Sequence, residues 1–256
     1  MRTNVIWHGT ASVELTSDCG SILFDPFVPL KGSTVPVQIE HFDGFSDIFI
    51  THGHFDHIAS LPEIVKRNPK TRIHCTKTPY KTLVRKGVDR GKLHLLHYGD
   101  MLTVNGFKIS VLHGKHAILP RATIKRLTYI LTHPARGNIP YILRENRVDV
   151  ENDETVVYEI GAGERNICIM GSMNLRDEVE YPTCADLLIL PYNGWEDNFP
   201  PACRVIERLK PKRVLLDHYD DTFPPLTMPL DLAPILEKYE GRVAAMEIGK
   251  VEEIME

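Results

Sequence analysis

Thr51-His52-Gly53-His54-Phe55-Asp56-His57 is the stretch that decides how this chain folds and what it holds, because it places three imidazoles and one carboxylate within residues 52–57. Neutral imidazole and carboxylate are ligands that Zn²⁺ and similar borderline cations prefer. Without a metal, these titratable groups would crowd one another after losing their water, at a cost in free energy. The stretch therefore predicts a transition-metal site.

Both flanks of this stretch have the pattern of regular structure. Before it comes the apolar, strand-like run Asp47-Ile48-Phe49-Ile50. After it, residues 58–66 carry apolar side chains at helical spacing, which predicts a helix. Ligands at a strand end that leads into a helix are held by rigid elements, as a metal site requires.

Four ligands in one loop cannot complete the shells of two metals, so further ligands must come from the ends of other strands. Two apolar runs end in histidine: residues 111–116 read Val-Leu-His-Gly-Lys-His, and residues 214–218 read Val-Leu-Leu-Asp-His. The first run offers His113 or His116 and the second offers His218, each where the chain leaves a sheet.

Short β-type runs and helical patterns occur in both halves of the chain. Asn105-Gly106 lies between the apolar runs 101–104 and 107–113, which is the strongest short signal for a hairpin. Later strand candidates are residues 156–160, 166–170, 186–190, 213–216 and 243–248, and helix candidates are residues 203–209 and 230–239. Two β-rich halves, each with helices, predict an α/β fold in which two sheets pack face to face with helices outside.

Residues 117–153 differ from the rest of the chain. Three prolines interrupt them, and apolar residues at helical spacing predict one short amphipathic helix (Pro120, Pro134, Pro140; Ile124, Leu127, Ile130, Leu131). They are basic up to residue 148, with only Glu145 opposing six cations (Arg121, Lys125, Arg126, Arg136, Arg144, Arg147). We interpret this segment, called the insertion below, as a lid within a single domain over residues 1–256.

The composition narrows the classes of function. The chain has 256 residues, 43% apolar and 25% charged, and no apolar run approaches the ~20 residues of a membrane span, so we expect no membrane partner. A net charge of −4 argues against general binding to nucleic acid. The five cysteines are scattered without a CxxC pair, and the first residues lack the apolar core of a secretion signal, so we expect a cytoplasmic protein.

Several motifs together resemble those of the metallo-β-lactamase superfamily of metallohydrolases, over nearly the whole chain. His-x-His-x-Asp-His at residues 52–57 is similar to the central motif of that family. Residues 7–12, 23–27 and 185–191 resemble its N-terminal turn, its Asp-Pro stretch and a later strand segment, with Thr10 where many members have histidine. The resemblance is closer to lactonase-like and phosphodiesterase-like members, and it implies a four-layer αββα sandwich with the site at the edge where both sheets end.

The resemblance also implies which residues hold metal. His52, His54 and His116 would form a first metal site, and Asp56, His57 and His218 a second. Asp25 and Asp217 would orient imidazoles, and His113 would be a neighbour. One departure matters: the family usually has Gly-Asp where this chain has Gly171-Ser172, and that aspartate bridges the two metals. A serine hydroxyl is a poor bridge, so we expect weaker binding at one of the two sites.

The expected chemistry is hydrolysis. A bound metal lowers the pKa of its water towards ~7, and the resulting hydroxide attacks a carbonyl carbon or phosphorus. Asp56 would orient the nucleophile and take a proton, and His218 would stabilise the developing oxyanion. Zinc is the leading metal, with one or two ions, and manganese, iron or nickel stays open. The substrate expected is a small ester, lactone or phosphodiester, anionic because the insertion is basic.

Three other interpretations stay open at this point. The chain could be a nuclease of the same superfamily, or a metal-binding sensor or scaffold with little catalysis because of Ser172. A di-iron redox role is a third, which the missing carboxylate makes weaker. The basic insertion is equally compatible with a solvated helix face or a contact in a homo-oligomer.

Overall fold

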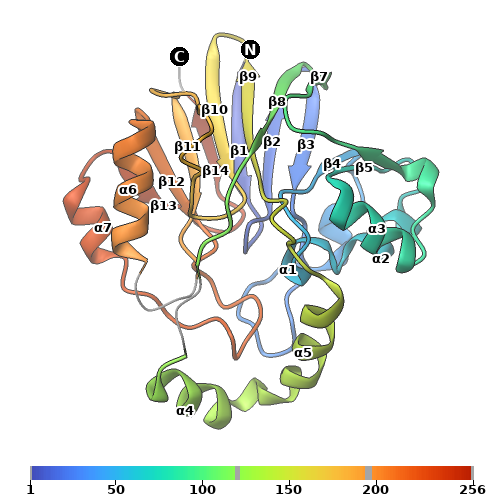
Figure 1. The fold of residues 1–256 in the computed structure, drawn as a ribbon, viewed down its shortest axis with the longest axis vertical. Coiled ribbons are helices and arrows are strands. Elements are labelled where there is room, and N and C mark those ends of the chain that lie inside the picture. The colour runs from blue at the N-terminus through green and yellow to red at the C-terminus, as the bar shows by residue number, and fades with distance from the viewer. Residues whose placement is uncertain (1, 119–121, 194–197, 255–256) are drawn as a thin grey trace.

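Two mixed sheets of seven strands face one another across the centre of the molecule (Figure 1). The structure is a computed structural model that describes residues 2–118, 122–193 and 198–254. The first sheet has the order β14-β1-β2-β3-β4-β5-β6 (Val251–Ile254, Thr3–Trp7, Val13–Ser17, Gly20–Phe24, Asp47–Phe49, Arg72–Cys75, Leu93–Leu95). The second has the order β13-β12-β11-β10-β9-β8-β7 (Val243–Ala245, Arg213–Asp217, Leu187–Pro191, Arg165–Met170, Val156–Ala162, Phe107–His113, Met101–Val104).

Helices cover the outer faces of the sheets and one end of the molecule. The bounds of the α-helices, α1 to α7, are Phe55–Ile58, Leu61–Arg67, Lys77–Arg85, Ile124–Thr132, Ile139–Val148, Phe199–Leu209 and Ala233–Lys238. In the described part of the chain, three short 3-10 helices, η1 to η3, span Ile39–Phe42, Arg90–Lys92 and Pro134–Asn138. In Figure 1, α2 and α3 lie beside the first sheet, α6 and α7 lie beside the second, and α4 and α5 lie below both.

Three apolar clusters show why these layers pack. One cluster joins inward-facing residues of both sheets, such as Val5 and Leu15 with Ile160 and Ile189. A second lies between the first sheet and helices α2 and α3, and a third lies between the second sheet and helices α6 and α7. Each sheet thus buries both faces, which confirms the predicted four-layer αββα arrangement.

The sheet topology brings distant chain segments to one edge. β3 runs parallel to β4, and β10 runs parallel to β11 and β12. β8 and β10 are both antiparallel to β9, so they share a direction. Because strands of one direction end at the same edge, the loops after β3, β4, β8, β10 and β12 gather below the sheets in Figure 1.

The structure confirms the predicted hairpin and corrects three predicted elements. Asn105 and Gly106 both have positive φ, 50° and 81°, as the tight turn between β7 and β8 requires. The helix predicted over 58–66 is present with different bounds: α1 ends at Ile58 and α2 spans Leu61–Arg67, because Pro62 fits a helix start but not an interior. The last strand candidate stops at Ala245 rather than residue 248.

The third correction concerns the insertion, whose residues 119–121 lie outside the described residues. It contains the expected helix, α4, but also a second one, α5, which the prolines concealed. Pro140 occupies the first turn of α5, where its missing N–H leaves no hydrogen bond unmade. Within the described part of the chain, none of the helices has the length and apolar character needed to cross a membrane.

Candidate metal centre

The six predicted ligands converge at the edge where the strands end, in two groups of three. In each group the candidate ligand atoms lie within 4.8 Å of one another. We call His52, His54 and His116 the first triad, and Asp56, His57 and His218 the second triad. The ring centroids of His52 and His57 are 3.9 Å apart, so the triads are adjacent. Segments separated by more than 160 residues, around His52 and His218, thus meet in one cluster.

Two glycines allow the backbone segments around the first triad to approach closely. A Cβ on Gly53 would lie 2.3 Å from the carbonyl oxygen of Val150, and a Cβ on Gly171 would lie 2.4 Å from Cβ of Thr51. Both distances are too short for any side chain to fit without movement of the backbone. The glycine in the His-x-His motif therefore serves packing, and Gly171 lets β10 end directly against the motif.

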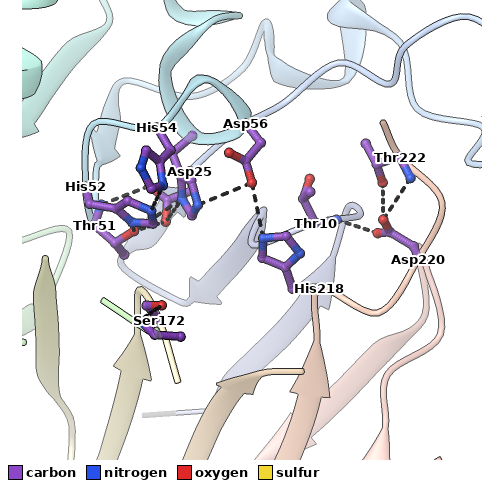
Figure 2. Close-up of polar contacts among 12 residues, drawn as sticks. Thr10, Asp25, Thr51, His52, His54, Asp56, Ser172, His218, Asp220 and Thr222 are labelled. Atoms are coloured by element: carbon purple, nitrogen blue, oxygen red, sulfur yellow. Dashed lines mark hydrogen bonds and ion pairs between the residues drawn. The ribbon is translucent and has the colours of Figure 1, made fainter. Parts of the chain in front are cut away.

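A separate set of hydrogen bonds holds His218 in the second triad. Its backbone is in the left-handed region, with φ 60°, and its N–H donates to the carbonyl of Thr10 at 2.9 Å. The Asp220 carboxylate accepts hydrogen bonds from the N–H of Thr10 and from Thr222, as Figure 2 shows. The N-terminal turn and the loop after β12 are thereby tied together, which positions a strained residue at the site.

In the first triad, hydrogen bonds set which ring nitrogen carries the proton. The Thr51 hydroxyl donates its one proton to Oδ2 of Asp25 at 2.6 Å. In its 3.1 Å contact with Nδ1 of His52, the hydroxyl must therefore be the acceptor and Nδ1 the donor. Nδ1 of His116 donates to the carbonyl of Ala117 at 2.8 Å. In both imidazoles the proton lies on Nδ1 and the lone pair on Nε2 is available for a metal.

The electrostatics of the first triad favour neutral imidazoles. Burial lowers the pKa of His52 well below its usual range, helped by the neighbouring histidines. Burial likewise lowers the pKa of His54 to about 4 and lowers the pKa of His116. Nε2 of His52 and Nδ1 of His54 lie 3.1 Å apart. Two nitrogen atoms that direct their lone pairs at one cation have such a separation. These groups are ready to bind metal at neutral pH without losing a proton.

The second triad is built around a carboxylate. Oδ2 of Asp56 lies 3.2 Å from Nε2 of His218 (Figure 2). The same oxygen lies 3.6 Å from Nε2 of His57. On its other side, Nδ1 of His57 lies 3.0 Å from Oδ2 of Asp25. Burial opposes charge on both imidazoles, but Asp25 and Asp56 outweigh it and raise the pKa of His57, while Asp56 raises that of His218 to about 9. The same histidines hold the pKa of Asp56 below its usual range against burial.

This donor set fits a transition metal. It supplies imidazole nitrogens and one carboxylate, with two Nδ1 protons fixed by carbonyl or hydroxyl acceptors and a third directed at Asp25. Such outer contacts are what ligating histidines usually make, because they fix ring orientation and raise basicity. Asp25 was expected to orient an imidazole, and the structure places it next to that of His57.

The remaining predicted residues have different surroundings. His113 is outside the cluster: its Nε2 contacts the carbonyl of Asp153 and its ring stacks on Tyr98, so His116 occupies the position for which both competed. Asp217 is buried, which raises its pKa to about 8, and its Oδ1 has no hydrogen-bond partner among the residues that the structure describes. Ser172 borders the cluster and its hydroxyl accepts from the N–H of Ala117 at 2.9 Å.

A cavity of about 480 Å³ opens in front of both triads. Its far wall is mainly apolar and comes from α1, the insertion and the loop after β12 (Phe55, Ala122, Ile130, Phe223, Leu226). The buried guanidinium of Arg126, on α4, also lines it and donates to the carbonyl of Leu226 at 2.5 Å. The cavity therefore combines a metal-binding floor with an apolar wall that carries one permanent cation.

Sequence reasoning missed the role of Thr51 and the composition of this wall. Thr51 was part of the central motif, directly before His52 and after a buried strand. That position was the signal that its hydroxyl could connect His52 to a buried carboxylate, here Asp25. Nothing in the local sequence pointed to Phe223 or Leu226, because their contribution depends on how the loop after β12 folds back over the site.

Comparisons with known proteins agree with this fold. A family model described as the beta-lactamase superfamily domain matches residues 21–219. A metal-dependent hydrolase of Sulfolobus acidocaldarius is 28% identical over 122 residues, 43% of this chain and 49% of that protein, so the chain spans about half of its length. A metal-dependent hydrolase of Methanocaldococcus jannaschii is 25% identical over 256 residues, 98% of this chain and 99% of that protein.

A solved structure extends the likeness to three dimensions. A metallo-beta-lactamase fold protein from Bacillus subtilis matches with a TM-score of 0.64 at 17% identity, covering 98% of this chain and 99% of that chain. At this identity the match shows a shared fold.

Proposed function

The chain belongs to the beta-lactamase superfamily, and from that premise we propose that it is a metal-dependent hydrolase of a small anionic ester, lactone or phosphodiester. The observation that carries the proposal is the pair of triads on the floor of one cavity. The names of the relatives, metal-dependent hydrolases, support the same activity. The five free cysteines support a reducing, cytoplasmic setting.

The first triad would hold the tighter metal, and zinc suits its three imidazoles best. When bound, such a metal supplies a Lewis acid and hydroxide at neutral pH. The second triad would hold another ion more weakly, since it must release the proton of His218 and has Ser172 instead of a bridging carboxylate nearby.

The side chains of the second triad would take part in the reaction directly. Because its pKa is held low, Asp56 stays ionised. It would accept a hydrogen bond from the nucleophile and so orient it, but it would not keep the proton of the nucleophile. Where the second triad holds no ion, His218 is an imidazolium that lines the cavity and stabilises negative charge developing on the substrate.

The far wall of the cavity supports the choice of substrate. Its apolar side chains would contact the non-reacting part of a small molecule, and the charge of Arg126 would favour a carboxylate or phosphate. A cavity of about 480 Å³ suits a small molecule. This argues for lactones, esters and phosphodiesters rather than a polynucleotide.

The test combines metal analysis with an activity screen. Purified protein is stripped with a chelator, reloaded with zinc, manganese, iron(II) or nickel, and assayed on panels of lactones, carboxylic esters and phosphodiesters. We expect hydrolysis in at least one panel that is lost on chelation. His54→Ala should lower the rate more than the roughly 100-fold that losing an outer contact costs. His97→Ala, at an exposed histidine that belongs to neither triad, is the matched control.

Two results would contradict the proposal. Metal-loaded protein that is silent in all three panels would favour the sensor or scaffold interpretation, for which the replacement of the bridging aspartate by Ser172 is the motivating feature. Cleavage of polynucleotides with steep dependence on salt would favour the nuclease interpretation instead.

A further inference from the structure

Exposed apolar side chains are concentrated in the insertion. Among the described residues, eleven large apolar side chains are exposed, and seven of them fall within residues 118–150 (Ile118, Ile124, Leu127, Leu131, Leu143, Val148, Val150). The other four are scattered over β6, the turn after it, β7 and β14. Scattered apolar residues are normal on a protein surface, but a concentration on one segment indicates a site of interaction.

Helix α4 has two apolar faces with different surroundings. Its inner face carries Arg126 and Ile130, which line the cavity. Its outer face carries Ile124, Leu127 and Leu131, at the i, i+3 and i+7 spacing of one helical stripe, and they are 85%, 49% and 67% exposed. In Figure 1, α4 lies at the end of the molecule, below the sheets and away from α6 and α7. The fold thus leaves the outer stripe uncovered.

The exposed charge of the segment that carries this stripe, residues 122–150, has one sign. Every exposed charged residue from 122 to 150 is basic (Lys125, Arg136, Arg144, Arg147). The two acids of that range, Glu145 and Asp149, are buried, and both contact Nζ of Lys86, at 2.7 and 2.6 Å. Both acids therefore oppose Lys86, directly after α3, and Glu145 also pairs with Arg144 at 2.8 Å. Lys125, Arg136 and Arg147 are the exposed cations that neither acid contacts, so the outer surface of residues 122–150 is both apolar and positive.

This combination decides between the two simplest occupants. A second copy of the chain related by two-fold symmetry would place the same patch against itself, and Lys125, Arg136 and Arg147 of one copy would face the same three cations of the other. An anionic lipid surface would instead accept the apolar stripe among its acyl chains and neutralise the flanking cations. The charge pattern thus favours lipid.

We propose that the outer face of α4, with the exposed cations of the insertion, is a docking surface for anionic membranes. The earlier expectation of no membrane partner rested on the lack of a ~20-residue apolar run, but adsorption of an amphipathic helix needs no such run. Docking would place the lipid next to α4, whose inner face forms part of the cavity wall. It requires neither a bound metal nor hydrolysis.

The test is flotation of the full chain with vesicles of phosphatidylcholine mixed with phosphatidylglycerol, and with vesicles of phosphatidylcholine alone. We expect binding to the anionic vesicles only, weakening as salt is added. Leu127→Gln with Leu131→Gln should weaken binding by roughly tenfold for each leucine. Arg136→Gln with Arg147→Gln should weaken it by about fivefold for each cation. Met101→Gln, at an 83% exposed methionine on β7, should change nothing.

Three results would overturn the proposal. The first is failure of the natural chain to float with anionic vesicles, and the second is unchanged flotation of the Leu127/Leu131 double variant. The third is sedimentation analysis in which the natural chain is a dimer and the double variant a monomer, because a second copy would then cover the stripe. Since these substitutions are at exposed positions, an unchanged melting temperature verifies that each variant is folded.

Discussion

The two triads are adjacent, yet their imidazoles titrate in opposite directions. Burial lowers the pKa values of His52, His54 and His116, which contact hydroxyl or carbonyl groups or one another. In the second triad, Asp25 and Asp56 raise the pKa of His57, and Asp56 raises that of His218, although both of these imidazoles are buried, as that of His52 is. The difference shows that burial alone does not set the protonation state of a histidine; the placement of two carboxylates does.

This contrast has a direct consequence for metal binding. A metal ligand must be deprotonated, so a proton and a metal compete for each imidazole. At neutral pH the first triad has already lost its protons, while the second must release at least the proton of His218, whose pKa is about 9. The two sites of one cluster should therefore differ in affinity and in their response to pH.

The largest expected effect is on metal affinity as the pH falls. Below the pKa of a ligand, affinity falls about tenfold per pH unit for each proton displaced. Between pH 8 and 6 the second site should therefore weaken by roughly 100-fold through His218 alone, with His57 adding to it. The first site should stay constant over this range, because the pKa of His54 is about 4 and that of His52 lies well below its usual range.

Calorimetric zinc titrations at several pH values, in buffers of different ionisation enthalpy, measure both affinities and the protons released. The distinction between the triads would be wrong if the zinc affinities of both sites fell in parallel as the pH was lowered. It would also be wrong if zinc binding at the second site released no proton at pH 7.

A smaller effect is expected from Asp25→Asn, which acts on the cause of the contrast. The amide keeps the shape of Asp25 but removes the charge that faces His57 at 3.0 Å. Loss of such an outer carboxylate typically weakens metal binding by roughly 10–100-fold, and we expect this at the second site measured at high pH. The pKa of His57 should also fall, so the second site should depend less on pH. The first site should change less, since Asp25 reaches His52 only through Thr51.

Asp47→Asn is the matched control for this prediction. Asp47 is also a buried carboxylate, and it contacts a histidine, His74, at 2.9 Å. It is the first residue of β4, however, whereas the metal motif follows the last residue of that strand. It should leave both metal affinities unchanged. If the two variants have the same effect on metal binding, the effect of Asp25→Asn is a general loss of stability and not a loss of charge behind His57.

The contrast between the triads also marks how far the sequence could lead. Five of the six ligands were predictable because residues 52–57 and His218 follow apolar runs, and strand ends of one direction meet at one edge. For the sixth, the residues alone offered His113 or His116, and the choice of His116 came from the family resemblance. The split into two triads came from the family resemblance. The direction of the pKa shifts was not predictable, because it depends on distances between Asp25, Asp56 and His57 that local patterns do not contain.

The regions that sequence described poorly share a physical cause. The break between α1 and α2 and the start of α5 both occur at prolines, which end some helices and begin others, and the local pattern does not distinguish the two. His113 and His116 follow the same strand, and only the contact of His113 with Asp153, 40 residues away, separates their roles. The apolar cavity wall comes from α1, the insertion and the loop after β12, whose contact is a property of the fold.

The smallest expected effect comes from Ser172→Asp, which should narrow the difference between the sites. Ser172 lines the cavity beside both triads, at the end of β10, and its hydroxyl accepts from the N–H of Ala117, a bond that a carboxylate can also make. An added negative charge there should tighten the weaker metal site by on the order of tenfold, the effect of about 1.4 kcal/mol. The tighter site should change little, because its ligands are already complete and neutral.

Ser172→Asn separates charge from shape in this prediction. The amide has nearly the same size as the carboxylate and can accept the same hydrogen bond from Ala117, but it adds no charge near His57 or His218. If the two variants bind the second zinc equally, the charge is not felt by the metals, and the weakness of the second site must come from the protons on its histidines alone. If only Ser172→Asp strengthens binding of the second zinc, the absence of a bridging carboxylate and the competition with protons both weaken the second site. Zinc affinities measured at several pH values then show how much each of the two contributes.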